Sequence, residues 1–179
     1  DKRLFGKYDT IPKKIKTYFL PSELEEIGDF LLCYATNLGG ITIPKKVHTI
    51  GSGAFLYCSS LDSLVFDGDE VQTIGDSAFS HCTQLSKILL QDTLPPIIEA
   101  HTFEGVDRSI PIHVPLGSSQ RYKEAPYWCE FQNFIEPSPA TYVDEVHVQH
   151  NATQKVFLNG QLLIIKDNII YNIMGQKLP

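Results

Sequence analysis

A short repeated unit limits how this chain can fold. Two stretches, IGSGAFLYCSSL at residues 50–61 and IGDSAFSHCTQL at residues 74–85, carry Ile, Gly, Ala, Phe, Cys and Leu at the same offsets. The dipeptide Ile27-Gly28 lies at nearly the same interval before the first stretch. A unit of this length cannot bury its own apolar side chains, whereas stacked units cover one another's apolar faces. The spacing therefore predicts a solenoid.

Each unit contains the pattern of a short strand followed by a tight turn. Ile41 and Ile43 are apolar and flank Thr42, which is the alternating period of a β-strand, and Pro44 ends the strand. Gly51 permits a sharp turn that other residues resist. Because strands that follow one another in this way pair in parallel through right-handed crossovers, we expect a β-rich, right-handed solenoid with a parallel sheet along one side.

The segment IPKKVHTIGSGAFLYCSSLDSLVF, residues 43–66, resembles the bacterial leucine-rich repeats of the BspA type along its whole length. The resemblance implies an α/β leucine-rich repeat fold over about two thirds of the chain. The outer repeats are degraded, with Leu32 in place of Phe, Ala35 and Val106 in place of Cys, and Glu99 in place of Gly. Degraded repeats are typical of solenoid ends. The repeats are assigned to residues 21–43, 44–66, 67–90 and 91–114.

The sequence after the last repeat predicts a cap and then a separate tail. Residues 114–136 are rich in aromatic side chains, which suit a cap that covers the last turn of the solenoid. Residues 1–136 are therefore assigned to the solenoid with its cap, and residues 137–179 to a linker and a small β-meander. Within the tail, Asn159-Gly160 is a strong hairpin signal.

The chain ends in YNIMGQKLP, which resembles the C-terminal segment of many secreted proteins of the Bacteroidetes group. The resemblance implies a sorting or surface-attachment tail. An ordinary meander that packs on the solenoid is the alternative.

Charge and motifs exclude several classes of function. The net charge of −6 and the absence of a Lys/Arg stripe argue against a nucleic-acid partner. No apolar run is long enough to span a bilayer. The chain carries no P-loop, GxSxG, HExxH or GxGxxG motif, and no metal-ligand spacing. We therefore expect neither an enzyme nor a bound cofactor or metal.

The repeated cysteines have three interpretations. Equivalent residues in stacked turns lie about 5 Å apart, so Cys58 and Cys82 are expected to be neighbours. They could fill the core, form a disulfide or carry chemistry. Ala35 and Val106 occupy the same position in the outer repeats, which favours packing. Cys129, which lies in the aromatic cap, is expected to be buried as well.

A column of residues on the sheet is the predicted interaction site. These residues lie between two inward-facing apolar positions in each strand and must point outward. A solvated column would be mostly polar, whereas this one is largely apolar, which is typical of a protein contact surface. The high strand propensity of Val and Thr, or coverage by the C-terminal tail, would also explain it. The predicted partner-binding residues are Phe19, Thr42, Val65, Leu89 and His113.

Two functions follow from these features. The first is a non-catalytic, secreted or cell-surface repeat protein; the resemblance implies an adhesin-like role toward a host or bacterial surface protein. The second is a glycan-binding accessory module of a surface carbohydrate-utilisation system. It would use aromatic side chains for stacking, taken to be exposed at Phe19, Tyr57, Tyr127 and Trp128.

Overall fold

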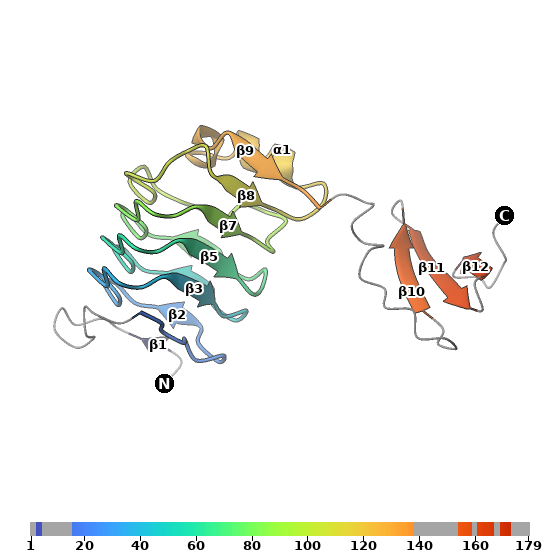
Figure 1. Ribbon diagram of the computed structural model, residues 1–179, viewed down its shortest axis with the longest axis horizontal. Helices are drawn as coiled ribbons and strands as arrows, with labels where there is room; N and C mark the ends of the chain where they lie inside the picture. The colour runs from blue at the N-terminus through green and yellow to red at the C-terminus, as the bar shows by residue number, and fades with distance from the viewer. Residues whose placement is uncertain (1–2, 5–15, 138–153, 159–160, 167–168, 173–179) are drawn as a thin grey trace. The chain divides into compact units, whose positions relative to one another are not determined.

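The computed structural model describes residues 3–4, 16–137, 154–158, 161–166 and 169–172. The chain divides into two compact units, Asp1–Glu136 and Pro137–Pro179. The first unit is a parallel β-solenoid and the second contains a three-stranded antiparallel sheet (Figure 1).

The predicted parallel sheet is confirmed, and it runs the length of the solenoid. Its inward-facing residues are in register from turn to turn, so that Ile41 pairs with Leu64, Leu64 with Ile88, and Ile88 with Ile112. All four side chains are buried because the alternation of a strand sends them to the same face. The strands are β3 (Gly40–Ile43), β5 (Ser63–Phe66), β7 (Lys87–Leu89), β8 (Pro111–His113) and β9 (Asn133–Ile135).

A second parallel sheet forms the opposite side of the turns, where the segment VHTIG, residues 47–51, predicts a second short extended piece but not a sheet. Its strands have only two residues each, so they are too short to show a period. Leu4 pairs with Ile27, which shows that one further turn precedes the first predicted repeat. The four strands are β1 (Arg3–Leu4), β2 (Glu26–Ile27), β4 (Thr49–Ile50) and β6 (Thr73–Ile74).

The interior is built around a stack of phenylalanine rings. The rings of Phe55 and Phe79 lie 5.0 Å apart, and those of Phe79 and Phe103 lie 5.4 Å apart, both nearly parallel. The turns approach closely beside this stack: a Cβ atom at Gly51 would lie 2.6 Å from the backbone nitrogen of Asp29. Glycine at this repeat position therefore sets the distance between turns.

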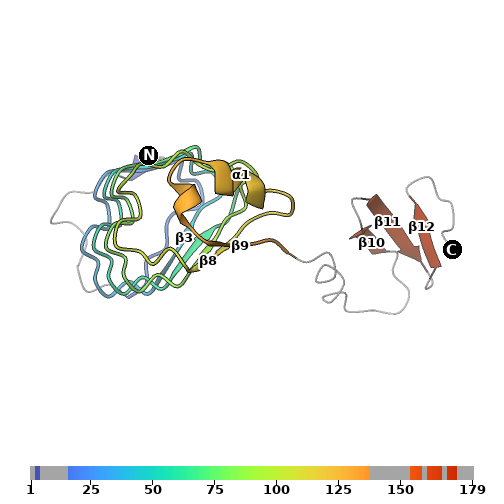
Figure 2. The same ribbon diagram turned by 90° about the horizontal axis from the view of Figure 1, so that it is seen from above.

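An aromatic cap closes the C-terminal end, as predicted. It comprises α1 (Ser119–Glu124) and the 3-10 helix η1 (Trp128–Glu130), which lie over the superimposed turns in Figure 2. Trp128 is only 1% exposed; its ring lies 5.5 Å from Phe103, and its Nε1 donates a hydrogen bond to the Pro96 carbonyl at 2.8 Å. The prediction for Cys129 is wrong, because η1 turns Trp128 inward and leaves Cys129 exposed.

The Glu136 carboxylate holds the start of the cap. It accepts hydrogen bonds of 2.8 Å from the backbone N–H groups of Gly117 and Ser119, beside the beginning of α1. A hydrogen bond from the Ser119 side chain and these two backbone bonds hold the pKa of Glu136 below its usual range, because they stabilise the ionised form.

The second unit has the topology predicted for the tail. Leu158 pairs with Gln161, which agrees with a hairpin at the Asn-Gly dipeptide between them, although that dipeptide lies outside the described residues. Residues 173–179, which include most of the predicted sorting segment, also lie outside them. The strands are β10 (Gln154–Leu158), β11 (Gln161–Lys166) and β12 (Ile169–Asn172), and adjacent strands are antiparallel.

Candidate functional site

Four of the five residues of the predicted column lie in one row on strands of the five-stranded sheet. The strand register pairs Thr42 with Val65, Val65 with Leu89, and Leu89 with His113. Phe19, the fifth residue, lies at the end of this row: a parallel bridge joins Thr17 to Gly40, and Phe19 lines the same depression as Thr42.

The row is accessible on the outer face of the sheet. Phe19 is 88% exposed, Thr42 is exposed, and Val65, Leu89 and His113 are partly exposed. Phe19, Thr42 and Val65 also line an open depression of about 390 Å³. We call these five residues, together with Ile135, the sheet-face column.

Ile135 extends the sheet-face column by one strand and was not found from the sequence. It pairs with His113 and is 37% exposed. Adding the interval between Leu89 and His113 to the position of His113 gives Pro137 rather than Ile135. The two differ because the turn that contains the cap is shorter than the others. A short helix and a 3-10 helix replace the usual turn, so the sequence period no longer locates the outward residue.

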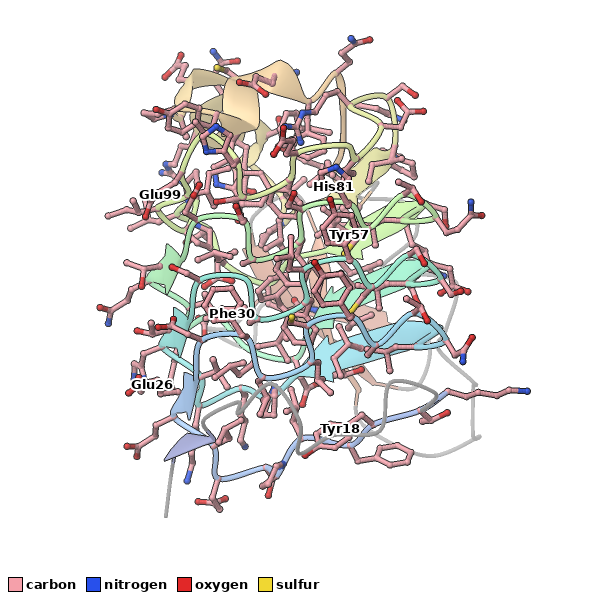
Figure 3. All side chains as sticks on the ribbon, turned by 90° about the vertical axis from the view of Figure 1, so that its left-hand side faces the viewer. Tyr18, Glu26, Phe30, Tyr57, His81 and Glu99 are labelled. Carbon is pink, nitrogen blue, oxygen red and sulfur yellow. The ribbon has the colours of Figure 1, made fainter. Side chains whose placement is uncertain are left out.

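A second exposed feature is an aromatic stack on the turn face. The rings of Tyr34 and Tyr57 lie 5.0 Å apart, and those of Tyr57 and His81 lie 4.4 Å apart. Figure 3 shows Tyr57 and His81 one above the other. All three residues have a positive φ, near 60°, which turns their side chains into the same direction at successive turns.

The aromatic residues proposed for glycan stacking do not form a platform. Both faces of the Tyr57 ring are covered by its neighbours in the stack, and Trp128 is buried, contrary to the prediction that it is exposed. Phe19 and Tyr127 are exposed but lie at opposite ends of the solenoid, before its first long strand and in its cap. These four residues therefore offer no paired stacking surface for a sugar.

The repeated cysteines pack in the core and are free thiols, so the disulfide alternative is wrong. The Cys58 Sγ donates to the carbonyl of Leu32 at 3.2 Å, and the Cys82 Sγ donates to that of Phe55 at 3.3 Å. Burial raises the pKa of Cys58 to about 12 and also raises that of Cys82. Because a thiolate is the reactive form, neither residue is suited to nucleophilic chemistry.

The described part of the chain offers little for other chemistry. Within residues 16–137 and the described strands, no group of three His, Cys, Asp or Glu residues is placed to hold a metal ion. The Ser80 hydroxyl lies 2.8 Å from His81 Nδ1, but Ser80 is buried, so its hydroxyl is not accessible to a substrate. The helices within those same residues are too short or too polar to cross a membrane.

Comparison with known proteins agrees with the geometry of the turns. A search of curated proteins gave no match. The model of the BspA-type leucine-rich repeat region, which spans six copies of the repeat, matches residues 11–117 and 72–177. Together these matches cover most of the chain, and the first spans the stacked turns described above. The chain therefore belongs to the family of BspA-type leucine-rich repeat proteins.

Proposed function

We propose that this protein acts at the cell surface or outside the cell and binds another protein through the sheet-face column. Repeats of the BspA type are generally protein-interaction or adhesion modules on a non-catalytic scaffold, and the proteins that carry them are typically associated with the cell surface. The observation that carries the proposal is the continuous row of exposed or partly exposed, mainly apolar side chains across every strand of one sheet.

The dimensions of the column suit a protein partner. Six positions separated by five strand spacings of about 4.8 Å make a row of about 24 Å. An interface of ordinary size, about 800 Å² on each partner, has a similar width. The row extends beyond the depression that Phe19, Thr42 and Val65 line, so a small ligand in that depression would leave the rest of the column uncovered.

The neighbouring residues give the column a polar border. Ser63, Lys87 and Asn133 lie one alternation before Val65, Leu89 and Ile135, and the strand period places them on the same face. An apolar centre with a polar rim is the usual anatomy of a protein interface, because the centre is desolvated and the rim stays wet. We infer that Phe19, Leu89 and Ile135 supply the main apolar contacts.

Substitution at the centre of the column tests this proposal. The Val65→Glu/Leu89→Glu variant places two carboxylates where apolar contacts are expected, and should weaken binding to a host or bacterial surface protein by at least about 100-fold. Thr83→Glu/Gln84→Glu is the matched control, since it adds the same charge at exposed positions outside the sheet.

Affinity is measured with the purified chain on intact partner cells, and circular dichroism checks that both variants fold. Equal binding by the two variants and the unmodified chain would rule out the sheet-face column as the contact site.

A further inference from the structure

A second depression, of about 400 Å³, opens beside three successive turns, away from the sheet-face column. Acidic side chains dominate its charge: Asp69 and Glu70 follow β5, and Asp92 follows β7. His48, from the turn before, also lines it, and its Nε2 lies 3.3 Å from the Glu70 carboxylate. We call this depression the acidic pocket.

Asp92 is the unusual member of the acidic pocket. The residue is only 3% exposed, and its Oδ2 atom has no hydrogen-bond partner among the described residues. The backbone N–H of Val71 donates a hydrogen bond to the carboxyl group, so one of its oxygens has a partner and Oδ2 has none. A buried acceptor without a partner is costly, and native proteins seldom retain one that serves no purpose.

The charges around Asp92 make the pocket attractive to a cation. Burial and the nearby Asp69 carboxylate raise the pKa of Asp92 to about 7, because both disfavour the ionised form. Arg121, on the cap, donates to the carbonyl of Thr93 at 3.4 Å rather than to a carboxylate. On the same side, the Tyr122 hydroxyl donates to the Asp92 backbone carbonyl and leaves the carboxyl group unneutralised.

The shape of the pocket distinguishes between kinds of cation. Among the described residues no three ligands are close enough to hold a metal ion. Val71, Leu94 and Pro95 form an apolar wall beside the carboxylates, and Leu94 is 68% exposed. Lysine and arginine side chains combine a charged end with an aliphatic stem that packs on such a wall.

We propose that the acidic pocket binds a lysine or arginine side chain of the partner protein. The charged group lies over the carboxylates of Asp69 and Asp92, and the aliphatic stem packs on Leu94 and Pro95. The inference rests on the proposed function only for the identity of the molecule that carries this side chain; the pocket's affinity for the side chain itself can be measured alone.

Binding of a cation has a predictable dependence on pH. A cation stabilises the ionised form of Asp92, so binding releases a proton and strengthens as the pH rises through about 7. The other titratable side chains that line the pocket are those of His48, Asp69 and Glu70.

The experiment is a titration of the full chain with the peptide acetyl-Gly-Arg-Gly-amide, followed by the amide NMR shifts of Val71, Gln72 and Thr93. We expect saturable shifts, with an affinity at about pH 8 at least about fivefold higher than at about pH 6. Asp92→Asn should abolish both the binding and its pH dependence. Glu104→Gln, at an exposed carboxylate outside the pocket, should change neither.

Three outcomes would overturn the assignment. The control peptide acetyl-Gly-Gln-Gly-amide could cause the same shifts, the Asp92→Asn variant could bind as well as the unmodified chain, or calcium chloride alone could shift the same amides and displace the peptide. If Asp92→Asn does not fold, Asp69→Asn takes its place. Because the titration needs no protein partner, its result is independent of the test of the sheet-face column.

Discussion

At the scale of single residues, burial decides which cysteines react. Cys58 and Cys82 are buried and donate hydrogen bonds to carbonyls of the preceding turn, whereas Cys129 is exposed on the cap. The interpretation of the repeated cysteines as core residues is confirmed. Ala35 and Val106 at the equivalent positions already indicated packing, but the thiol-to-carbonyl bonds could not be foreseen, since they depend on the detailed offset between turns.

The reactivity of the thiols should follow this burial. Treatment of the folded chain with iodoacetamide at about pH 8 should modify Cys129 well before Cys58 and Cys82, because burial raises the pKa of both core thiols. Peptide mapping by mass spectrometry gives the three rates, and labelling in denaturant provides the control in which they become similar. Equal rates in the folded chain would contradict the burial of these thiols.

The carboxyl group of Asp92 should make stability depend on pH. Its pKa rises from 3.8 to about 7 in the folded chain, so the folded state holds this proton more tightly than the unfolded state does. The contribution is complete below about pH 4 and is lost as the pH rises toward about 7, by up to about 4 kcal/mol.

Urea denaturation between about pH 4 and about pH 8 measures this loss. Asp92→Asn should flatten the pH dependence and should raise the free energy of unfolding at the alkaline end of the range. A variant with the same pH profile as the unmodified chain would show that Asp92 ionises normally.

At the scale of the elements, the distance between turns is fixed by glycine. Gly51→Ala brings a methyl group to within 2.6 Å of the Asp29 backbone nitrogen and should lower the free energy of unfolding by about 1–3 kcal/mol. Gly39→Ala is the matched control. Its new methyl group meets nothing nearer than the Lys16 carbonyl at 4.0 Å, so the change should stay within about 1 kcal/mol.

Chemical denaturation of the two variants compares these costs directly. A similar loss in both would mean that the close approach at Gly51 relaxes at little cost.

The strands and helices also show what the spacing of the repeats in the sequence can and cannot predict. The spacing of apolar residues located β3, β5, β7 and β8, because each strand repeats the inward-facing pair of its neighbour. It indicated a second short extended piece at residues 47–51, but strands of two residues are too short to predict a second sheet. It also missed Ile135, because α1 and η1 shorten the last turn. The glycan-binding alternative took Trp128 to be exposed, whereas its ring packs against Phe103 at the end of the phenylalanine stack.

At the scale of the whole molecule, the chain divides into two compact units, Asp1–Glu136 and Pro137–Pro179. A chain that ends at Pro137 should therefore keep the thermal midpoint of the solenoid to within about 2 °C. Removal of the cap as well, by ending the chain at Val114, should abolish cooperative unfolding because it exposes Phe103 and the edge of β8. Far-UV circular dichroism during heating measures both. A large drop in the midpoint after the first truncation would show that the solenoid depends on residues 138–179.

The position of Trp128 gives the solenoid an optical marker at one end. It is the chain's single tryptophan, and its ring packs against Phe103 and Phe131 in the cap. A stack in which each turn contacts only its neighbours can open from one end while the other remains folded. Tryptophan emission therefore follows the cap alone, whereas circular dichroism averages over all turns. An emission change at lower denaturant than the dichroism midpoint identifies the cap as the end that opens first, and the reverse order identifies the N-terminal turns.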